Sequence, residues 1–541
     1  MAAKTSQTHP LIINQVPVPD AGGVIGLTFC PGKKGDSMYS GRWDRDLTVD
    51  LAAIRDFGAK ALVTLMESQE FDGLQVSLTE LADRAKEFGL EWHHLPIRDV
   101  SIPGERFENQ WTYSGLRLRT MLARGENIVV HCHGGLGRTG MIGARLLVEF
   151  GDQPDVAIRR VREARPGSIE TSAQEKYVKS CSPVAWARVM RSQEERAVAC
   201  LIGGAVGDAF GYEVEFSSLK KIGERFGPAG IKAPVFHHGK LIVSDDTQMT
   251  LFTLEGVLQS LKKGSSWRSA CIFSIQQAYL DWLHTQRGDA GAGASVPSDR
   301  LIHQPEMCVQ RAPGNTCLGA LGSGGHGTIE KPVNDSKGCG GAMRTAPIGL
   351  LTFTQVDDVF RIGSEAAALT HGHPSGYLSA GMVAALVRVL MDGTSLTTRP
   401  GTYSDSGAID QCCSILQTYP KHEETLAAVQ KAVQLAAQKA HSHASAVESL
   451  GGGWVGEEAL AIALYAVLSA ESYVEAISIA ANHGGDSDST ASIAGQLWGA
   501  ANGLAGMPHD WVSRIDVLLP LLHLARQLAA LQHTAQAAAH L

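Results

Sequence analysis

Cysteine is scarce in this chain, and long apolar runs are missing from it. The 541 residues include ten cysteines, which stand singly apart from Cys412 and Cys413 and form no CxxC pair. That spacing argues against a disulfide framework and favours a reduced, cytoplasmic protein. The first ten residues lack a basic stretch followed by an apolar core, and no uncharged apolar run is long enough to cross a bilayer. We therefore expect neither a signal peptide nor a membrane anchor.

Clustered positive charge is also absent. The formal net charge is −8, with 44% hydrophobic and 19% charged residues, which is typical of an ordinary globular protein. A nucleic-acid-binding surface is not expected, because phosphate backbones recruit clustered Lys and Arg. The chain has no fixed-period repeat, and it is too long for one hydrophobic core, so we expect at least two domains.

The composition of the chain changes near residue 183. Before it, residues 61–66, 91–97 and 127–130 have the pattern of strands that alternate with helices, which predicts an α/β domain with a mainly parallel sheet covered on both faces. Beyond it the chain is rich in Ala, Leu and Gly, and its long helical patterns predict an all-α domain. We divide the chain into an N-terminal extension (1–19), an α/β domain (20–182), a linker (183–194), an all-α domain (195–530) and a tail (531–541).

The sharpest short motif is VVHCHGGLGRTG at residues 129–140. It places Cys132 between a predicted strand and a helix that starts at about Arg138. The backbone N–H groups of residues 133–138 can turn inward, and the helix N-terminus adds positive potential, so the loop can bind a phosphate dianion. The same field favours a nucleophilic thiolate at Cys132. Arg138 offers a two-pronged donor to phosphate oxygens, and Thr139 can donate its hydroxyl to the sulfur.

Phosphate-ester cleavage at this loop also requires a general acid, because a thiolate alone expels an alkoxide or phenoxide poorly. Asp99 follows a predicted strand in the segment HHLPIRDVSIP (93–103), in a loop that can close over the site. Asp99 alone is also compatible with a solvated turn, and a lone Cys after a strand is usually a small core residue. The arginine six positions after Cys132, with three intervening glycines, favours the catalytic interpretation.

These segments resemble a known family. The loop matches the CX5R(S/T) signature of protein tyrosine and dual-specificity phosphatases, and residues 93–103 and 165–178 resemble flanking segments of the kinase-associated phosphatase branch. The resemblance covers roughly residues 20–180. It implies that Cys132 is the nucleophile, Arg138 the phosphate clamp, Asp99 the acid and Gln174 a residue that positions the hydrolytic water. The phosphate-binding loop then consists of His133, Gly134, Gly135, Leu136 and Gly137.

The helical half contains two acidic clusters, VSDDTQM (243–249) and HGGDSDST (483–490). Each places carboxylate and hydroxyl oxygens before a predicted helix, a donor set that suits a hard cation such as Mg²⁺ better than zinc. Ser and Asp are also preferred N-cap residues, so each cluster alone is equally compatible with a simple helix start. Two paired clusters favour a shared metal site. Its candidate ligands are Ser244, Asp245, Asp246, Asp486, Asp488 and Ser489.

Further blocks in this half resemble the ADP-ribosylglycohydrolase family, the group of dinitrogenase reductase-activating glycohydrolase. They are GGAVGDAFGYEVEF (203–216), GCGGAMRTAPIG (338–349), LTHGHPSGYLSAG (369–381) and GGGWVGEEALAIALYAV (451–467), in the family's order. The resemblance covers about residues 195–510. It implies an all-α fold with two magnesium ions at the mouth of a cleft, held by the six residues of the acidic clusters.

The resemblance also implies roles for residues outside these clusters. Glu215 gates or assists the reaction, and His371 lies near the distal ribose, although a histidine at an apolar helix start is more often a core residue. Asp208 is expected to brace the first helix. Cys339 stands where many relatives have Asn, which removes a polar contact to the ligand. The loop that approaches the diphosphate consists of Gly338, Cys339, Gly340, Gly341 and Ala342.

Together the motifs predict two hydrolases in one chain. One is a phosphatase, and the other uses Mg²⁺ to release ADP-ribose from Arg, Ser or Thr side chains of a protein through an oxocarbenium-like state. Two alternatives stay open. Both domains can act instead on small-molecule phosphates and free ADP-ribosyl compounds, or one domain can serve only for binding. The oligomeric state and the coupling of the two activities are left open.

Overall fold

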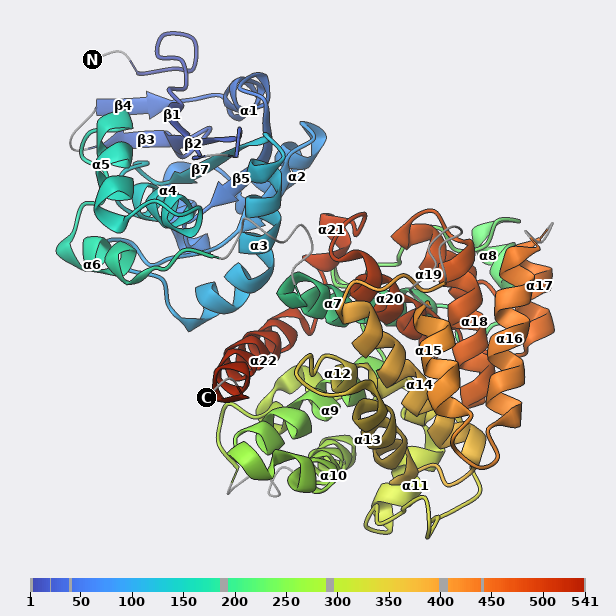
Figure 1. The fold of residues 1–541 in the computed structure, drawn as a ribbon. Helices are drawn as coiled ribbons and strands as arrows, with labels where there is room; N and C mark the ends of the chain where they lie inside the picture. The colour runs from blue at the N-terminus through green and yellow to red at the C-terminus, as the bar shows by residue number, and fades with distance from the viewer. Residues whose placement is uncertain are drawn as a thin grey trace. The chain divides into compact units, whose positions relative to one another are not determined.

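The computed structural model describes residues 3–19, 21–37, 41–184, 193–288, 296–397, 407–438 and 442–539. The chain divides into two compact units, Met1–Met190 and Arg191–Leu541 (Figure 1). The division falls close to the change in composition. Most of the predicted linker, residues 185–192, lies outside the described residues.

A five-stranded sheet organises the first unit. Its order is β1 (Asn14–Pro17), β2 (Val24–Phe29), β7 (Asn127–Cys132), β5 (Ala59–Thr64) and β6 (Glu91–His94). Only the β1–β2 pair is antiparallel, which confirms the predicted mainly parallel sheet. Because β7 is the central strand and pairs on both sides, its carboxyl end at Cys132 is fixed by two neighbours.

The sheet begins earlier in the chain than the sequence indicated. The edge strand β1 lies within the segment that we expected to be an extension, and β2 was not among the predicted strands. Strand β1 is only four residues long and buries one of them, Val16. It therefore lacks the apolar run from which a strand is predicted in a sequence. A separate hairpin joins β3 (Lys34–Ser37) to β4 (Gly41–Asp44).

Helices cover this sheet. Helix α4 is buried along its whole length and packs against β2, β7 and the helices α5 and α6, which Figure 1 shows grouped together. A fully buried helix cannot shift easily, so the loop between β7 and α4 has two fixed ends. The helices are α1 (Leu47–Asp56), α2 (Leu78–Glu87), α3 (Glu105–Ala123), α4 (Gly137–Glu149), α5 (Pro154–Ala164) and α6 (Ser172–Ser180), with the 3₁₀ turns η1 (Ser68–Glu70) and η2 (Asp72–Leu74).

The second unit is helical, as predicted, and its described residues contain isolated β-bridges but no named strand. The α-helices are α7 (Gln193–Tyr212), α8 (Leu219–Phe226), α9 (Asp245–Leu261), α10 (Trp267–Arg287), α11 (Asn315–Gly322), α12 (Ala346–Gly349), α13 (Val356–Ala368), α14 (Pro374–Met391), α15 (Ala408–Leu416), α16 (Glu423–Ala437), α17 (His443–Leu450), α18 (Gly456–Ser469), α19 (Tyr473–Ala481), α20 (Ser487–Asn502), α21 (His509–Val512) and α22 (Leu518–Ala539). The 3₁₀ turns are η3 (Gly264–Ser266), η4 (Leu301–His303), η5 (Pro305–Met307) and η6 (Cys339–Arg344). Helix α22 extends through most of the segment that we assigned to a tail.

Helices α7 and α20 run antiparallel and touch along their backbones. A Cβ atom added at Gly203, Gly207 or Gly211 of α7 would lie 2.4, 2.1 and 2.1 Å from a backbone oxygen of α20. Only glycine leaves room for so close an approach. The crossing brings the end of α7 against the start of α20, where one acidic cluster lies.

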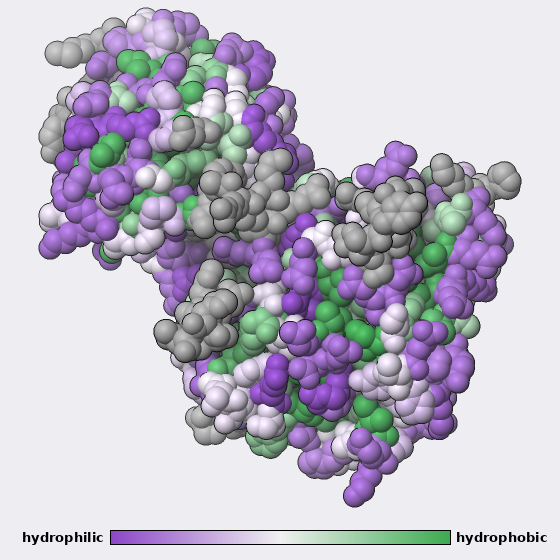
Figure 2. Space-filling model, in the orientation of Figure 1, coloured by the Kyte–Doolittle hydropathy of each residue, from purple (hydrophilic) through white to green (hydrophobic). Residues whose placement is uncertain are grey.

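Helix α14 is long and apolar enough, by length and composition, to pass a test for a membrane span. Its span is 94% buried inside the unit, however, and the core helix of a globular domain passes the same test. On the face drawn in Figure 2, hydrophilic side chains cover most of each unit, and hydrophobic ones appear as small separate patches.

Candidate active sites

The loop after β7 forms a narrow turn around the sulfur of Cys132. Gly135 has a φ of 75°, and a Cβ there would lie 2.3 Å from the carbonyl oxygen of Thr28, so only glycine fits. The N–H of Gly135 donates to the Cys132 sulfur over 3.2 Å. The thiol is 4% exposed. A backbone N–H therefore points at the sulfur, as the sequence predicted for an anion-binding loop.

Arg165 holds the outer side of this loop. Its guanidinium donates to the carbonyl oxygens of Gly135, at 2.5 Å, and Gly134, at 3.1 Å. Fixing these oxygens on the outer side favours inward-pointing N–H groups, the arrangement of an anion nest. Arg165 was not predicted to be a site residue, although it begins the flanking segment 165–178.

Arg138 lies at the centre of a polar network at the start of α4. Its guanidinium donates to Glu70 at 2.5 and 2.8 Å and to the Ile97 carbonyl at 2.9 Å, and it forms an ion pair with Asp99 at 2.8 Å. Burial opposes the charged form, but the hydrogen bonds to Glu70 and the negative charges of Cys132, Glu70 and Asp99 together outweigh it and raise the pKa of Arg138. In this structure the guanidinium is held by two carboxylates, Glu70 and Asp99. Glu70, in the turn η1, was not predicted from the sequence.

The loop that carries Asp99 is strained and tied at one point. Asp99 itself is 67% exposed in its side chain, and Val100 after it has a φ of 59°, a region that β-branched residues rarely adopt. The buried Gln174 donates from Nε2 to the Ser101 carbonyl at 3.4 Å. A Cβ on Gly137 would lie 3.0 Å from that same Nε2. Gln174 therefore lies between the acid loop and the phosphate loop.

The remaining predicted residues of this site surround the sulfur loop. His133 is exposed, and Leu136 immediately precedes α4. The buried hydroxyl of Thr139 bonds no described residue, which leaves it available to the sulfur.

Lys33 is a cation near this site that sequence analysis missed. It is 8% exposed, and its ammonium lies 4.7 Å from the ring of Phe29 and 4.6 Å from that of Trp43. Burial lowers its pKa, and the nearby thiols of Cys30 and Cys132 act in the opposite direction. A buried ammonium held by aromatic faces adds positive potential beside the Cys132 loop.

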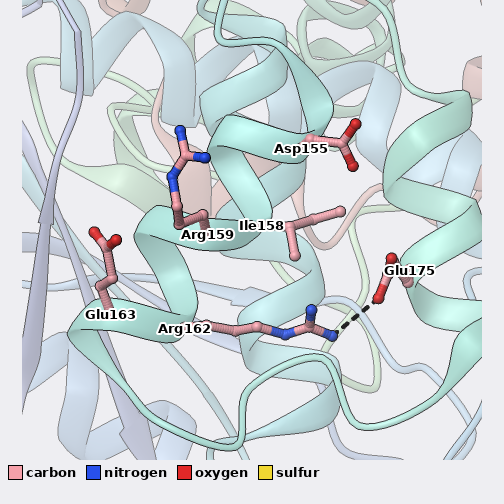
Figure 3. A pocket seen from close by; sticks show the side chains of 6 residues that line it. All are labelled: Asp155, Ile158, Arg159, Arg162, Glu163 and Glu175. Atoms are coloured by element: carbon pink, nitrogen blue, oxygen red, sulfur yellow. Dashed lines mark hydrogen bonds and ion pairs between the residues drawn. The ribbon is translucent and has the colours of Figure 1, made fainter.

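A surface pocket of about 400 Å³ lies elsewhere on the first unit, between α5 and α6 (Figure 3). Figure 3 shows Ile158 between charged side chains of both signs and the ion pair of Arg162 with Glu175, 3.0 Å long. None of the predicted site residues lines it. The lining residues are Asp155, Ile158, Arg159, Arg162, Glu163 and Glu175.

The second site is built where three helix ends meet. Glu215 follows α7, and Asp486 and Asp488 begin α20, and one carboxylate oxygen of each lies within 4.8 Å of the others. Asp245 and Asp246 form the first turn of α9, and both interact electrostatically with Asp488. The structure therefore brings the two predicted clusters and Glu215 together.

Hydroxyls and one further carboxylate join these helix ends. The Ser244 hydroxyl bonds Asp488 and also accepts from the Asp246 N–H at 3.2 Å. Asp208 on α7 accepts from the N–H groups of Ser244 and Thr247, which caps the start of α9. We expected Asp208 to brace the first helix of this unit, but its hydrogen bonds instead cap the start of α9. Ser489 donates its N–H to Asp488 at 3.0 Å.

So many buried carboxylates in one place oppose one another's charge. Burial, and then the charge of Asp488, raise the pKa of Glu215 to about 10 and that of Asp208 to about 7. The same two causes raise the pKa of Asp245, Asp246 and Asp486. Oxygen Oδ2 of Asp246 and Oε2 of Glu215 bond no described residue. A donor set of unpartnered, mutually repelling oxygens fits a hard divalent cation.

The loop of residues 338–342 adjoins this cluster on one side and His371 on the other. Cys339 donates its S–H to Asp486 at 2.6 Å, and burial raises the pKa of this thiol. A Cβ on Gly338 or Gly340 would lie 3.0 Å from the imidazole of His371. Gly341 packs on α13, and Ala342 is buried.

Two aromatic rings at the second site were not predicted. Phe216, next to Glu215, is 71% exposed and stacks on Trp454, which is 46% exposed, with 6.0 Å between ring centroids. The Trp454 carbonyl accepts from the N–H of Cys339 at 3.1 Å. Exposed stacked aromatics beside an acidic site offer a flat surface to a ligand.

The folds and sites together define a two-domain hydrolase. Residues 190–538 match the family described as ADP-ribosylglycohydrolase, and the chain belongs to that family. Residues 39–152 match the family described as "Polymorphic toxin system, DSP-PTPase phosphatase", so the first unit is of the dual-specificity phosphatase type. Both family predictions made from the sequence are confirmed.

Individual relatives agree with this division. The chain is 23% identical over 332 residues to the ADP-ribosyl-[dinitrogen reductase] glycohydrolase of Rhodospirillum rubrum, covering 60% of this chain and 92% of the relative. It is 28% identical over 157 residues to cyclin-dependent kinase inhibitor 3 of Rattus norvegicus, covering 28% and 69%. A shorter match, 41% over 71 residues, covers 13% of this chain and 19% of the ADP-ribosylarginine hydrolase Tri1 of Pseudomonas putida (strain GB-1).

Proposed function

We propose that the second unit uses two Mg²⁺ ions to remove ADP-ribose from a modified protein side chain, while the first unit hydrolyses phosphomonoesters through a phosphocysteine. The cluster of buried carboxylates at three helix ends, with oxygens that no described residue bonds, carries the first proposal. The Cys132 loop with its inward N–H and the adjacent Arg138 carries the second.

In the proposed phosphatase reaction, the Cys132 thiolate attacks phosphorus and the bond to the ester oxygen breaks. As the substrate binds, Asp99 leaves its ion pair with Arg138 and takes up a proton from solvent, and Arg138 turns its fork to the phosphate. Asp99 then gives that proton to the departing oxygen. Water then attacks the phosphocysteine. Asp99 takes back a proton, and the sulfur leaves as a thiolate that accepts a hydrogen bond from Thr139.

In the proposed glycohydrolase, the candidate ligands are Ser244, Asp245, Asp246, Asp486, Asp488 and Ser489. Bound Mg²⁺ would supply charge that holds the ribose hydroxyls and orients water. Glu215 lies beside Asp486 and Asp488, and in this proposal it exchanges a proton with the water or the leaving group. The Gly338–Gly340 segment presents backbone close to the ligand, and Phe216 and Trp454 offer a flat surface beside it.

The linkage is tested by release of ADP-ribose from Arg-, Ser- and Thr-linked proteins with Mg²⁺ and with EDTA. Arginine is the first linkage to test, because one matching relative is an ADP-ribosylarginine hydrolase. We expect release only with Mg²⁺, and none by Asp486→Ala protein. If all three substrates stay intact while a relative of known activity cleaves them, the proposal fails, and free ADP-ribosyl compounds become the substrates to test.

The phosphatase substrate is tested by comparing kcat/KM for a phosphotyrosine peptide with values for nucleotide and sugar phosphates. We expect the peptide to be preferred; preference for the small phosphates would favour the alternative substrate class. We also propose a reduced, cytoplasmic location, which the ten unpaired cysteines support.

A further inference from the structure

Arg344, at the end of η6, is a buried cation without an acidic partner among the described residues. It is 0% exposed, and its guanidinium contacts the sulfurs of Met249 and Cys317 at 3.2 and 3.4 Å and lies 4.1 Å from the ring of Tyr279. Burying an arginine on sulfur and an aromatic face is costly unless its charge acts on something nearby. Its hydrogen bond to the hydroxyl of Thr370 is short, at 2.7 Å.

That contact starts a short chain of hydrogen bonds. Arg344 donates to the Thr370 hydroxyl oxygen at 2.7 Å, and the same oxygen lies 2.8 Å from Nδ1 of His371. The alternative acceptor for the Thr370 proton, the Ala367 carbonyl, is farther away at 3.4 Å. All three side chains are buried.

The direction of these bonds follows from the chemistry of the guanidinium. Arginine can only donate, so the Thr370 oxygen accepts from it and its own proton is left to donate. If the Thr370 hydroxyl donates to Nδ1 of His371, its bond is 2.8 Å long, shorter than the 3.4 Å to the Ala367 carbonyl. If Nδ1 instead carried the proton and donated to the Thr370 oxygen, two positively polarised hydrogens, its own and that of Arg344, would point at the same oxygen. Nδ1 is then the unprotonated nitrogen, and the proton of the neutral imidazole is on Nε2. Burial and the charge of Arg344 lower the pKa of His371 to about 3, so the ring stays neutral at pH 7.

The Nε2 edge of His371 faces the glycine loop. A Cβ on Gly338 would lie 3.0 Å from Nε2, and one on Gly340 3.3 Å from it. No described residue forms a hydrogen bond with Nε2, although the histidine is 1% exposed. An N–H donor without a partner, on a buried residue and beside backbone that carries no side chain, is suited to an oxygen of a bound molecule.

We propose that Arg344 and Thr370 are positioning residues that fix His371 as a neutral Nε2–H donor to an oxygen of the bound ADP-ribosyl group. The proposal rests on the proposed glycohydrolase function for the identity of the ligand. It goes beyond that function because it assigns a role to Arg344 and Thr370. Neither residue contacts the ligand, and both act through His371.

The test uses the full-length protein, Mg²⁺ and ADP-ribose in titration calorimetry. Thr370→Val removes the hydroxyl at nearly constant volume, and Thr370→Ser keeps it as the matched control. We expect the Val variant to bind ADP-ribose about 5- to 10-fold more weakly, the loss of one oriented hydrogen bond, and the Ser variant to stay within about 2-fold. In His371→Ala protein, Thr370→Val should cause no further loss, whereas a merely structural threonine would weaken binding in both backgrounds.

The second readout needs no ligand. Nitrogen-15 NMR of histidine-labelled protein, with His371→Gln used to assign the signal, shows which ring nitrogen carries the proton at pH 7. An Nδ1–H tautomer overturns the relay, as does equal ADP-ribose binding by the Thr370→Val and unmutated proteins. If the unmutated protein shows the Nε2–H tautomer but binds no ADP-ribose, the glycohydrolase proposal fails and the role of the relay fails with it.

Discussion

The two sites of this chain are built in different ways. The Cys132 site depends on one continuous loop between a central strand and a fully buried helix, with Arg138 on the first turn of that helix. The acidic site joins the end of α7 and the start of α9 to the start of α20, which lies more than 200 residues further along the sequence. A local site is specified by a short motif, whereas an assembled site exists only if distant helices pack correctly.

The electrostatics of the two sites also differ. At Cys132, a backbone N–H group and the cations Arg138 and Lys33 create a site for an anion. The nearby acids Glu70 and Asp99 each form an ion pair with Arg138. At the second site the acids face one another and raise one another's pKa. The first site therefore pairs its charges with protein groups, while the second contains carboxylate oxygens that the proposed cation would bind.

The sharpest way to separate the two sites is Cys132→Ser. We expect it to lower phosphatase kcat by about 10⁴-fold or more, because no other group forms the covalent intermediate, and to leave ADP-ribose release unchanged. Both activities are measured on one preparation, with Cys181→Ser as the control. A parallel loss of ADP-ribose release would contradict the independence of the two sites.

Asp99→Asn tests whether the strained loop carries the acid. We expect kcat for an alkyl phosphate to fall about 10²- to 10³-fold, and that for an aryl phosphate with a good leaving group to fall much less. The exposed Asp83→Asn serves as the control. An equal loss on both substrates would mean that Asp99 acts through Arg138 and not as an acid.

Asp488→Asn tests the cation at the assembled site. Mg²⁺ at 100 times its Kd stabilises a protein by about 2.7 kcal/mol, so the unmutated protein should melt at a higher temperature with Mg²⁺ than with EDTA. The variant should lose this difference, and the exposed Asp335→Asn should keep it. Equal stabilisation of all three proteins would place the cation elsewhere.

Gly207→Ala tests the helix crossing on which the assembled site depends. Its Cβ would lie 2.1 Å from the Ala491 carbonyl oxygen, so α7 and α20 must move apart. We expect a loss of about 1–3 kcal/mol in the free energy of unfolding and weaker Mg²⁺ stabilisation, with phosphatase activity intact. Gly223→Ala, where a Cβ meets nothing within 4 Å, is the matched control.

The last prediction concerns pH and the first unit. Burial lowers the pKa of His131 to about 3, so below pH 6.5 the unfolded chain binds a proton that the folded chain does not. Stability is therefore lost as pH falls from 6.5 towards 3, by about 2 kcal/mol at pH 5. Hydrogen exchange of β7 should accelerate between pH 7 and 5, after correction for intrinsic rates, and His131→Gln should reduce that change. The exposed His9→Gln should not.

The sequence predicted the parts of each site that depend on local order. Cys132, Arg138 and Thr139 follow from one loop, and Ser244 and Asp486 follow from the starts of two helices. Glu70, Arg165 and Lys33 were missed because each reaches the Cys132 site from another segment, and no spacing in the sequence connects them to it. The edge strand β1 was missed because it buries only Val16.

The glycine contacts between α7 and α20 also bear on the order in which the chain becomes active during synthesis. Gly203 accepts a hydrogen bond from Tyr473, 270 residues later, and packs on Gly495. At about 5–20 residues per second, the ribosome makes the first unit well before α20 leaves it. A nascent chain can therefore hold a finished Cys132 loop while its acidic helix starts still lack their partner, and a transcript truncated before α20 would encode a phosphatase alone.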